Sequence, residues 1–428
     1  MRMRLRTRLT LLAAAAIWLT AVASGSGQKT LTPSAMRNHA AIGYATTPPA
    51  DAVARLAGRL ERGEVALTFD PATGGYLRSV LRALDISLDS QLLVFSKTSF
   101  QARKIGPQNP RALYFNDTVS VGFVRGGDIL EFVAQDPRQG AMFYTLENAA
   151  GAAPQIKRDL SCVQCHTWEA TLDVPGMFLG SIYPAPDGSV MYAPAFNTDH
   201  RTPFDIRWGG WYVTGKHAIP RHMANGVVAE GAQLADMVTP ATLHVDTLDG
   251  RFDMTSYASA QSDIVAMLVL EHQARMLNLI TRVGWESRLG AEAGRPLAGA
   301  VEDLVDYLLF VDEEVLPGPI VGSSTFARTF AARGPRDMQG RSLRDLDLST
   351  RLMRYPCSFL IYSEPFDALP DEAKRAVYAR LWAVLSGADA DPRYARLTAD
   401  DRRNVLEILR DTKPGLPDYF AQPQASSP

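Results

Sequence analysis

The sequence predicts an α+β fold: an antiparallel β-meander in the N-terminal part, a central segment of loops and strands, and a mainly helical C-terminal part. Two observations lead to this prediction. Between residues 92 and 146, short runs rich in valine, phenylalanine, tyrosine and leucine are separated by turn-forming pairs such as Asn116-Asp117 and Gly126-Gly127, which is typical of strands joined by hairpins. Beyond residue 255 the apolar residues recur at helical spacing instead.

The N-terminal part begins with a segment that shows neither the pattern of strands nor the helical spacing of apolar residues. Residues 24–48 are rich in serine, threonine, glycine and proline, so we expect a mobile lead-in. Residues 51–62 and 76–84 carry alanine, valine and leucine at helical spacing and are predicted to be helices. The strands of the meander are predicted at residues 92–97, 112–115, 119–124, 129–134 and 141–146.

A hairpin and a group of helices are expected after the meander. The hairpin is predicted at residues 178–183 and 190–194, and an aromatic strand at residues 208–214. Residues 262–285 are predicted to form a long buried helix, because apolar side chains surround most of it. Its polar residues are then expected to form a hydrogen-bonded core network or a polar pocket; they are Glu271, His272, Gln273, Arg275 and Asn278. Further helices are predicted at residues 297–310, 371–385 and 400–410.

The first 23 residues have the layout of a secretory signal peptide. Four arginines, at positions 2, 4, 6 and 8, precede an apolar run at residues 9–23 that ends in Ala21-Val22-Ala23. An uncleaved membrane anchor is the alternative, but a spanning helix needs about 20 apolar residues and this run is shorter. We therefore expect a protein that is exported to the periplasm, is soluble there, and has no stable membrane insertion after cleavage.

These patterns predict four parts and exclude several function classes. Residues 1–23 are the signal peptide, 24–155 an N-terminal α+β domain, 156–250 the central segment and 251–428 a mainly helical domain. The net charge is −2, with 44 basic and 46 acidic residues and no basic cluster, so nucleic acid is not expected as a partner. Motifs for phosphate binding, zinc proteolysis and serine hydrolysis do not occur in the sequence, so nucleotide use and hydrolysis by these routes lose support.

The central segment contains one motif that carries chemistry. Residues 162–166 read Cys162-Val163-Gln164-Cys165-His166, the pattern of c-type haem attachment. The two thiols can add to the haem vinyl groups as thioethers, and the imidazole of His166 then lies where it can bind the iron as the proximal ligand. The motif occurs once, so we expect one covalently bound haem c. Export agrees with this prediction, because bacteria attach haem c outside the cytoplasm.

Three other interpretations of the two cysteines were compared with haem attachment. A thioredoxin-like dithiol belongs at the turn of a βαβ unit, and no such alternation surrounds the motif. A structural zinc site needs four ligands, whereas the third cysteine of the chain, Cys357, is distant in sequence. A disulfide between Cys162 and Cys165 would leave the adjacent His166 unexplained.

At these residues the chain resembles the c-type cytochromes. The resemblance is local, covering residues 162–166 and the loop to Pro175-Gly176-Met177. Residues 111–117, 207–215 and 354–366 are in turn similar to a family of large exported bacterial proteins that contain a cytochrome c domain. That second resemblance spans most of the mature chain. It implies a haem c protein of unsettled physiological role and supplies no catalytic residues.

The ligand on the other side of the iron decides what such a haem can do. Histidine or methionine gives a six-coordinate electron-transfer haem, whereas an open position allows ligand binding or turnover. Met177 is our working distal ligand, because it follows a Pro-Gly turn a short loop after the motif. His200 is expected to face solvent, and His217 and His222 to lie in a loop. The remaining candidates are Met191, Met223 and His272.

Two further features could belong either to a site or to the core. Trp208, Trp211 and Tyr212 of the aromatic strand would wall the haem or pack in the core equally well. Cys357 is expected to be a buried, inert thiol, with a redox-active thiol as the alternative.

The leading functional hypothesis is a periplasmic mono-haem c-type cytochrome that exchanges electrons with a redox partner protein. Its weakness is size, because one-electron transfer does not require about 400 residues, well above the usual domain length. The alternatives are a haem-dependent oxidoreductase, with an open distal site or a second substrate site near residues 208–214 or 271–278, and a haem-based sensor.

Overall fold

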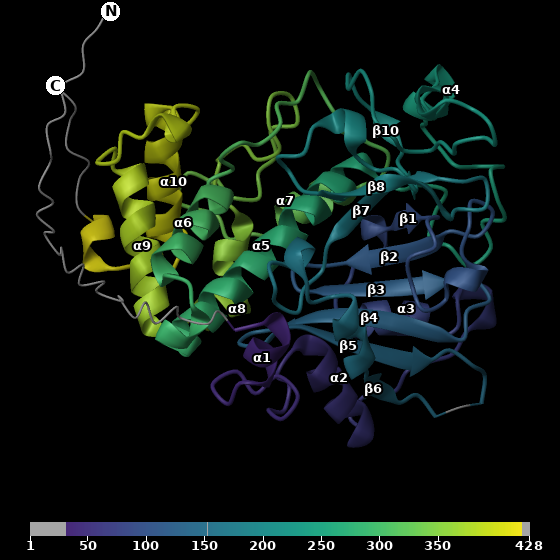
Figure 1. Ribbon diagram of the computed structural model, residues 1–428, viewed down its shortest axis with the longest axis horizontal. Helices are drawn as coiled ribbons and strands as arrows, with labels where there is room; N and C mark the ends of the chain where they lie inside the picture. The colour runs from purple at the N-terminus through teal and green to yellow at the C-terminus, as the bar shows by residue number, and fades with distance from the viewer. Residues whose placement is uncertain (1–30, 152, 422–428) are drawn as a thin grey trace, which may run out of the picture.

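The computed structural model describes residues 31–151 and 153–421. The predicted signal peptide, residues 1–23, lies outside them. Within the described residues, an antiparallel sheet occupies the N-terminal part and helices gather toward the C-terminus (Figure 1). The predicted α+β class is therefore confirmed.

The helices and strands follow the predicted order closely. The helices are α1 (Pro33–Asn38), α2 (Ala52–Glu61), α3 (Leu77–Ala83), α4 (Pro240–Leu243), α5 (Ile264–Leu289), α6 (Leu297–Leu308), α7 (Phe326–Ala332), α8 (Glu364–Asp367), α9 (Asp371–Leu385) and α10 (Ala399–Thr412). The strands are β1 (Leu92–Val94), β2 (Arg111–Phe115), β3 (Val119–Val124), β4 (Ile129–Asp136), β5 (Gly140–Glu147), β6 (Ile156–Arg158), β7 (Leu179–Pro184), β8 (Val190–Thr198), β9 (Trp211–Tyr212), β10 (Gly215–Lys216) and β11 (Val321–Gly322).

The main sheet is the predicted five-stranded meander, β1 to β5, with one strand added at each edge, β6 beside β5 and β9 beside β1. Its order is β6-β5-β4-β3-β2-β1-β9, and every neighbouring pair is antiparallel. Short turns join β2, β3, β4 and β5, as hairpin connections require, whereas longer segments connect β1 to β2 and β5 to β6, and β9 reaches the sheet from much later in the chain. Strands β7 and β8 form the predicted hairpin as a separate two-stranded sheet.

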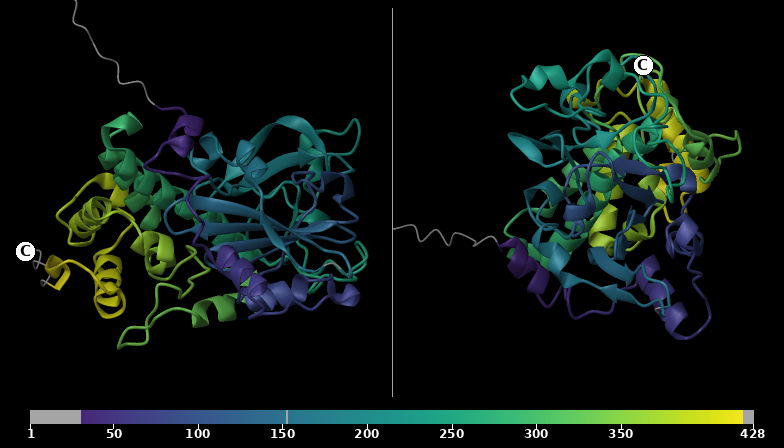
Figure 2. Two further views of the ribbon diagram at one scale, coloured as in Figure 1. Left: turned by 90° about the horizontal axis from the view of Figure 1, so that it is seen from below. Right: turned by 90° about the vertical axis from the view of Figure 1, so that its right-hand side faces the viewer.

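One face of the main sheet is fully covered. Tyr114, Val121, Phe132 and Tyr144 lie opposite one another on β2 to β5, and all four are buried. Helices α2 and α3 pack on this side, and in the left view of Figure 2 the purple α2 runs along the blue strands. The helices contribute Val53, Leu56, Leu77, Val80 and Leu81 to this core.

The opposite face of the sheet is covered only in part. Along β4, buried and half-exposed residues alternate from Ile129 to Ala134, and β2 begins with the same alternation. Helix α5 covers one end of this face, where Gln135 donates a hydrogen bond to Thr281 (2.7 Å) and Phe115 joins the helical core. The remainder of this face lies next to the residues that follow β6.

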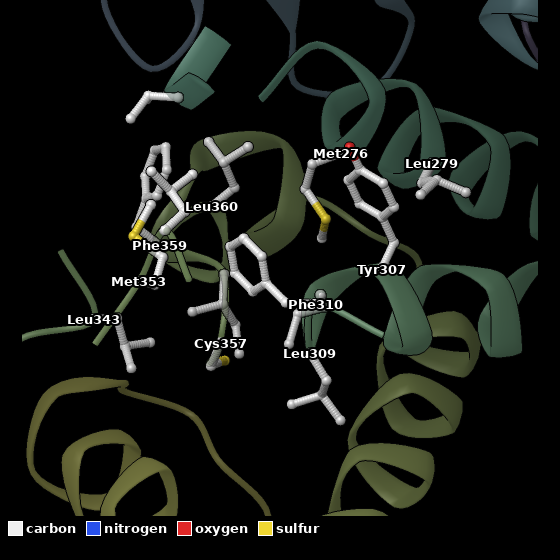
Figure 3. Close-up of a cluster of buried hydrophobic side chains, with 14 of the residues drawn as sticks. Met276, Leu279, Tyr307, Leu309, Phe310, Leu343, Met353, Cys357, Phe359 and Leu360 are labelled. Atoms are coloured by element: carbon white, nitrogen blue, oxygen red, sulfur yellow. The ribbon is translucent and has the colours of Figure 1, made fainter. Parts of the chain in front are cut away.

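Helix α5 is the centre of the helical part. It contacts α6, α7, α8 and α9 as well as strand β5, and it is buried on nearly all sides. Figure 3 shows part of the core beside it, in which Met276 of α5 and Tyr307 and Phe310 near the end of α6 face Phe359 and Leu360. No helix among the described residues combines the length and the apolar composition needed to cross a membrane.

Two predictions about local structure are wrong. The lead-in is ordered from residue 31, because Ile42 and Tyr44 are buried and the Tyr44 hydroxyl donates to the carbonyl of Ala141 (2.7 Å). The aromatic strand is reduced to β9, because Trp208 adopts a positive φ of 71°. Gly209 follows so close to β7 that an added Cβ would lie 1.9 Å from the carbonyl oxygen of Ile182, so the chain cannot continue there as an ordinary strand.

The N-terminus of α5 provides a test of how far the fold depends on this helix. Asp263 caps it by accepting hydrogen bonds from the backbone N–H groups of Val265 (2.7 Å) and Ala266 (3.2 Å), and it also accepts two from Ser324. Because the carboxylate is buried, Asp263→Ala should lower the free energy of unfolding in urea by about 2–4 kcal/mol. Asp70→Ala, which removes a less buried cap of a short 3-10 helix, should cost about 1 kcal/mol. Equal losses of stability in the two variants would contradict the conclusion that the fold depends strongly on α5.

Candidate functional site

The C-x-x-C-H motif of residues 162–166 lies in a tight turn directly after the edge strand β6. A 3-10 helix spans Leu160–Gln164, and the Asp159 side chain caps it by accepting from the Ser161 N–H (2.8 Å). The backbone N–H groups of Cys165 and His166 both donate to the carbonyl of Cys162, each at 3.1 Å. The turn therefore holds both thiols and the imidazole close together. Both cysteines are free thiols, Cys162 half-buried and Cys165 exposed.

The imidazole of His166 is oriented by a single backbone carbonyl. Its Nδ1 lies 2.9 Å from the carbonyl oxygen of Gly176, and because a carbonyl only accepts, Nδ1 carries the proton and Nε2 has the lone pair that a metal requires. The ring packs between Phe143 on β5 (centroids 4.8 Å apart) and Phe178 (5.6 Å). Burial lowers the pKa of His166, which favours the neutral form that binds metals.

Helix α5 holds the carbonyl that orients this histidine. The side chain of Asn278 accepts from the Met177 N–H (3.3 Å) and donates to the Met177 carbonyl (2.8 Å), which clamps the chain just after Gly176. The Gly176 N–H in turn donates to the His166 carbonyl (3.0 Å) and closes the loop. A side chain at position 176 would collide with Asn278, 2.2 Å from an added Cβ. Sequence analysis missed these positioning roles of Gly176 and Asn278.

The environment of Cys162 argues against a redox-active dithiol. Burial, followed by the negative charges of Asp159 and Glu131, raises the pKa of Cys162 to about 12. Dithiol oxidoreductases instead depend on a thiolate with a lowered pKa. The thiol of Cys357 is fully buried, as predicted, and burial raises its pKa as well.

The half-exposed face of the main sheet lies beside this motif. Arg111 on β2 and Glu131 on β4 form an ion pair across β3 (3.1 Å), with side chains 18% and 16% exposed. Gly122 lies between them in the sheet, where an added Cβ would come within 3.3 Å of the Glu131 carboxylate. The absence of a side chain at Gly122 therefore leaves the space over β3 to Arg111 and Glu131. Arg111 and Glu131 both influence the pKa of His166, which places the pair within electrostatic range of the imidazole.

The working distal ligand, Met177, lies between the sheet and α5. It is half-buried and lines a small cavity with residues of β3, β4, β5 and α5. Its backbone follows directly on the Gly176 carbonyl that orients His166. Met191 is half-buried on β8, beside a small cluster formed by Met223, Val228 and Met237. Met177 as distal ligand remains a prediction.

Three of the histidines form a separate group near β10. His217 Nε2 and His222 Nε2 lie 3.3 Å apart, and both can donate to the Leu243 carbonyl, at 3.0 and 3.2 Å. His222 Nδ1 accepts from the Ala224 N–H (3.2 Å), so its Nε2 must carry the proton when the ring is neutral. His244 is exposed beside His217. Among the described residues, no group of three or more His, Cys, Asp or Glu side chains is arranged to hold a metal ion.

The expectation that His200 faces solvent is wrong, because it is buried against α5. Its Nδ1 lies 2.8 Å from Nδ1 of His272, and Nε2 of His272 lies 2.7 Å from the Ser358 hydroxyl. Both imidazoles stack on Tyr307 and Phe310. The polar half of α5 thus forms a hydrogen-bonded core network, one of the two outcomes expected for it. Beside it, Glu271 forms a fully buried ion pair with Arg207 (3.1 Å).

The aromatic residues before and within β9 are buried. The Trp211 indole donates to the Gly180 carbonyl (2.8 Å), and the Tyr212 hydroxyl donates to the Pro107 carbonyl (2.9 Å). Trp208 packs with Phe204 and His222. These contacts give all three residues a role in the core.

No protein-family model matches this chain, and neither curated proteins nor solved structures provide a match. Its function is therefore inferred from its own residues.

The buried histidines predict a loss of stability in acid. Burial lowers the pKa of both His222 and His272 to about 3, whereas in the unfolded chain the pKa is about 6.5. Between these values only the unfolded chain binds the proton, so stability is full above pH 6.5 and falls as the pH drops, by about 1.4 kcal/mol per pH unit for each group. Urea unfolding of the wild type between pH 7 and 4.5 measures this decline.

Substitution of His272 tests how much of the loss of stability in acid comes from the buried network of His200, His272 and Ser358. His272→Gln should be less stable than the wild type at pH 7, because it loses its stacking partners, and its stability should fall less steeply with acid. His244→Gln, at an exposed position, should keep the wild-type dependence. An unchanged slope in His272→Gln would show that His272 is not the group that titrates.

Proposed function

We propose that this protein is an exported mono-haem c-type cytochrome that passes electrons to or from a redox partner protein. Cys162 and Cys165 would bind haem c covalently, and His166 would be the proximal ligand. The observation that carries the proposal is the orientation of His166, whose Nδ1 donates to the Gly176 carbonyl (2.9 Å) and leaves Nε2 available beside two free thiols. When bound, the haem supplies one-electron oxidation and reduction.

The surroundings of His166 suit an electron carrier. A hydrogen bond to Nδ1 fixes the tautomer of a ligating histidine and increases its basicity. Asn278 holds the Gly176–Met177 segment from a buried helix, and Phe143 and Phe178 confine the ring. The imidazole therefore keeps one orientation, and little rearrangement of the protein accompanies a change of charge at the iron.

The motif also lies where a partner protein can approach. Cys165 is exposed, and two large apolar residues flank the motif at the surface: Leu160 is 45% exposed and Trp168 is 44% exposed. Exposed aromatic side chains such as Trp168 are enriched at sites where another protein docks. An electron carrier needs such access at the edge of its haem.

Export to the periplasm forms part of the proposal. The arginine-rich start, the apolar run and the Ala21-Val22-Ala23 sequence of residues 1–23 support a cleaved signal peptide. Covalent haem attachment supports the same compartment, because bacteria carry out this reaction outside the cytoplasm.

An oxidoreductase or sensor with an open distal position is the second candidate, and one observation favours it. The four histidines weighed as distal ligands are engaged in the described structure: His200 with His272, and His217 and His222 with the Leu243 carbonyl. His222 and His272 use both ring nitrogens and would have to break these buried arrangements to bind iron, whereas Nε2 of His200 and Nδ1 of His217 have no hydrogen-bond partner within the described residues. If neither His200 nor His217 reaches the iron, the distal side holds a methionine or remains open, and an open position allows small molecules to bind.

Replacing the two motif cysteines tests covalent attachment. In cells with a haem c maturation system, the wild type should keep its haem after denaturation, and the double variant Cys162→Ala/Cys165→Ala should lose it completely. Cys357→Ala removes a buried thiol outside the motif and should retain wild-type haem content. Haem staining after denaturing electrophoresis and the pyridine haemochrome spectrum provide the measurement. A wild type without covalent haem would overturn the proposal.

Binding of carbon monoxide (CO) to the reduced haem distinguishes an electron carrier from an oxidoreductase or sensor. If Met177 binds the iron, the spectrum of the reduced wild type should not change with CO, and that of Met177→Ala should shift. Met191→Ala, which changes a half-buried methionine on β8, should behave like the wild type. A CO-induced shift in the wild type itself would reject Met177 as a strong ligand and favour the oxidoreductase or sensor.

A further inference from the structure

A surface hollow lies where helix α5 passes from the main sheet to the helical part. Its volume is about 160 Å³, and its walls come from the turn between β4 and β5, from α5, and from α8 with the segment that follows it (Figure 1). Ile280, Pro365 and Leu369 give it an apolar wall, and all three residues are buried. The hollow therefore offers an apolar body a place to pack.

Two arginines line the same hollow, and their guanidinium groups repel each other. Arg288, half-buried in the last turn of α5, donates from Nη2 to the carbonyl of Arg138 and from Nε to the carbonyl of Gly284 (3.1 Å). Burial, followed by the positive charge of Arg138, lowers the pKa of Arg288 to about 10. Among the described residues, neither guanidinium forms an ion pair with a carboxylate, so both keep donors for another group.

The acid that attracts Arg288, Asp136, is already used by the backbone. Its carboxylate accepts from the N–H groups of Ala50 (2.7 Å), Arg138 (2.9 Å) and Gln139 (2.9 Å). Two like charges held together without a counter-ion repel each other. A bound anion would remove this repulsion and accept from the unused N–H groups of the two guanidinium groups.

A glycine in α5 keeps the hollow open. Gly284 lies in the interior of this helix, where glycine is less favourable than alanine. The nearest atom to an added Cβ would be in Leu369, at 3.5 Å, which is an ordinary contact distance. Packing of α5 therefore does not require glycine at this position. Both residues line the hollow, so a methyl group here would narrow it.

We propose that this hollow binds a small carboxylate whose apolar body is about the size of one ring. Arg138 and Arg288 would bind the carboxylate, and Ile280 and Leu369 would pack against the body. A guanidinium matches a carboxylate through two parallel hydrogen bonds, and a cavity of about 150 Å³ is large enough for benzene. The inference goes beyond electron transfer and does not require haem, because the lining residues lie outside the motif loop.

Benzoate is the probe for this site, and benzamide is its neutral counterpart. In isothermal titration calorimetry of the whole purified protein, benzoate should bind at one site, and benzamide should bind more weakly by about tenfold or more. Arg138→Gln and Arg288→Gln should each weaken benzoate binding by about tenfold or more. Arg59→Gln, at an exposed position on α2, should keep the wild-type affinity. Because Arg138 is exposed, its variant decides the test if Arg288→Gln fails to fold.

Narrowing the hollow is the second test, and it separates binding from stability. Gly284→Ala should raise the urea midpoint of unfolding, because alanine favours the helix, and should at the same time weaken benzoate binding. Gly299→Ala on α6, where an added Cβ meets nothing within 4 Å, should raise the midpoint and leave benzoate binding unchanged. Unchanged binding in Gly284→Ala would overturn the placement of the ligand in this hollow.

The remaining outcomes decide the class of ligand. Absence of benzoate binding, equal binding of benzamide, or wild-type affinity in Arg138→Gln would overturn the proposal. Binding of inorganic phosphate in place of benzoate would also overturn it, because the site would then recognise the charge without an apolar body. All of these results leave the proposed haem function standing, since that function is tested by haem content.

Discussion

The arrangement around the motif depends on the clamp that Asn278 forms on the backbone of Met177. This clamp fixes the Gly176 carbonyl, and that carbonyl fixes the tautomer and direction of the His166 ring. Asn278 itself is placed by α5, which is buried on nearly all sides and capped by Asp263. The orientation of the His166 ring, in the middle of the chain, is therefore set by packing in the C-terminal half. A hydrogen bond to the ring nitrogen that does not bind the metal commonly controls how a histidine binds one.

Helix α5 also explains why the chain is much longer than the motif of residues 162–166. One side of α5 presents Asn278 and Thr281 to the motif loop and the sheet. The other side carries Glu271 and His272 into a buried network with Arg207, His200 and Ser358. Buried polar groups are costly unless they are paired, and paired groups specify one arrangement of the packed elements. The surplus length thus builds a rigid support, which an isolated loop around residues 162–177 could not provide.

Sequence periodicity predicted much of the fold and the motif, but not the contacts that give the motif its geometry. Strands such as β3 and helices such as α9 were placed correctly, because alternation and turn residues act over short distances. The environment of His200 could not be foreseen, because its partner His272 is 72 residues away. Ordering of residues 31–48 depends on Tyr44, which reaches β5 only in the folded chain. Asn278 was recognised as a buried polar residue, but its partner lies 101 residues earlier.

The distribution of histidines limits what chemistry the chain can support. Burial lowers the pKa of His222 and His272, and each ring already has hydrogen-bond partners within the core. A buried neutral imidazole that leaves its partners to bind iron would strand those partners without hydrogen bonds, at a cost of about 1–3 kcal/mol for each buried group. His166 has no such constraint at Nε2, since its ring bonds through Nδ1, and within the described residues His200 and His217 likewise each keep one ring nitrogen without a partner. His222 and His272 therefore stabilise the fold through both ring nitrogens, and a haem held as proposed would meet a methionine, His200, His217 or an open position on the side opposite His166.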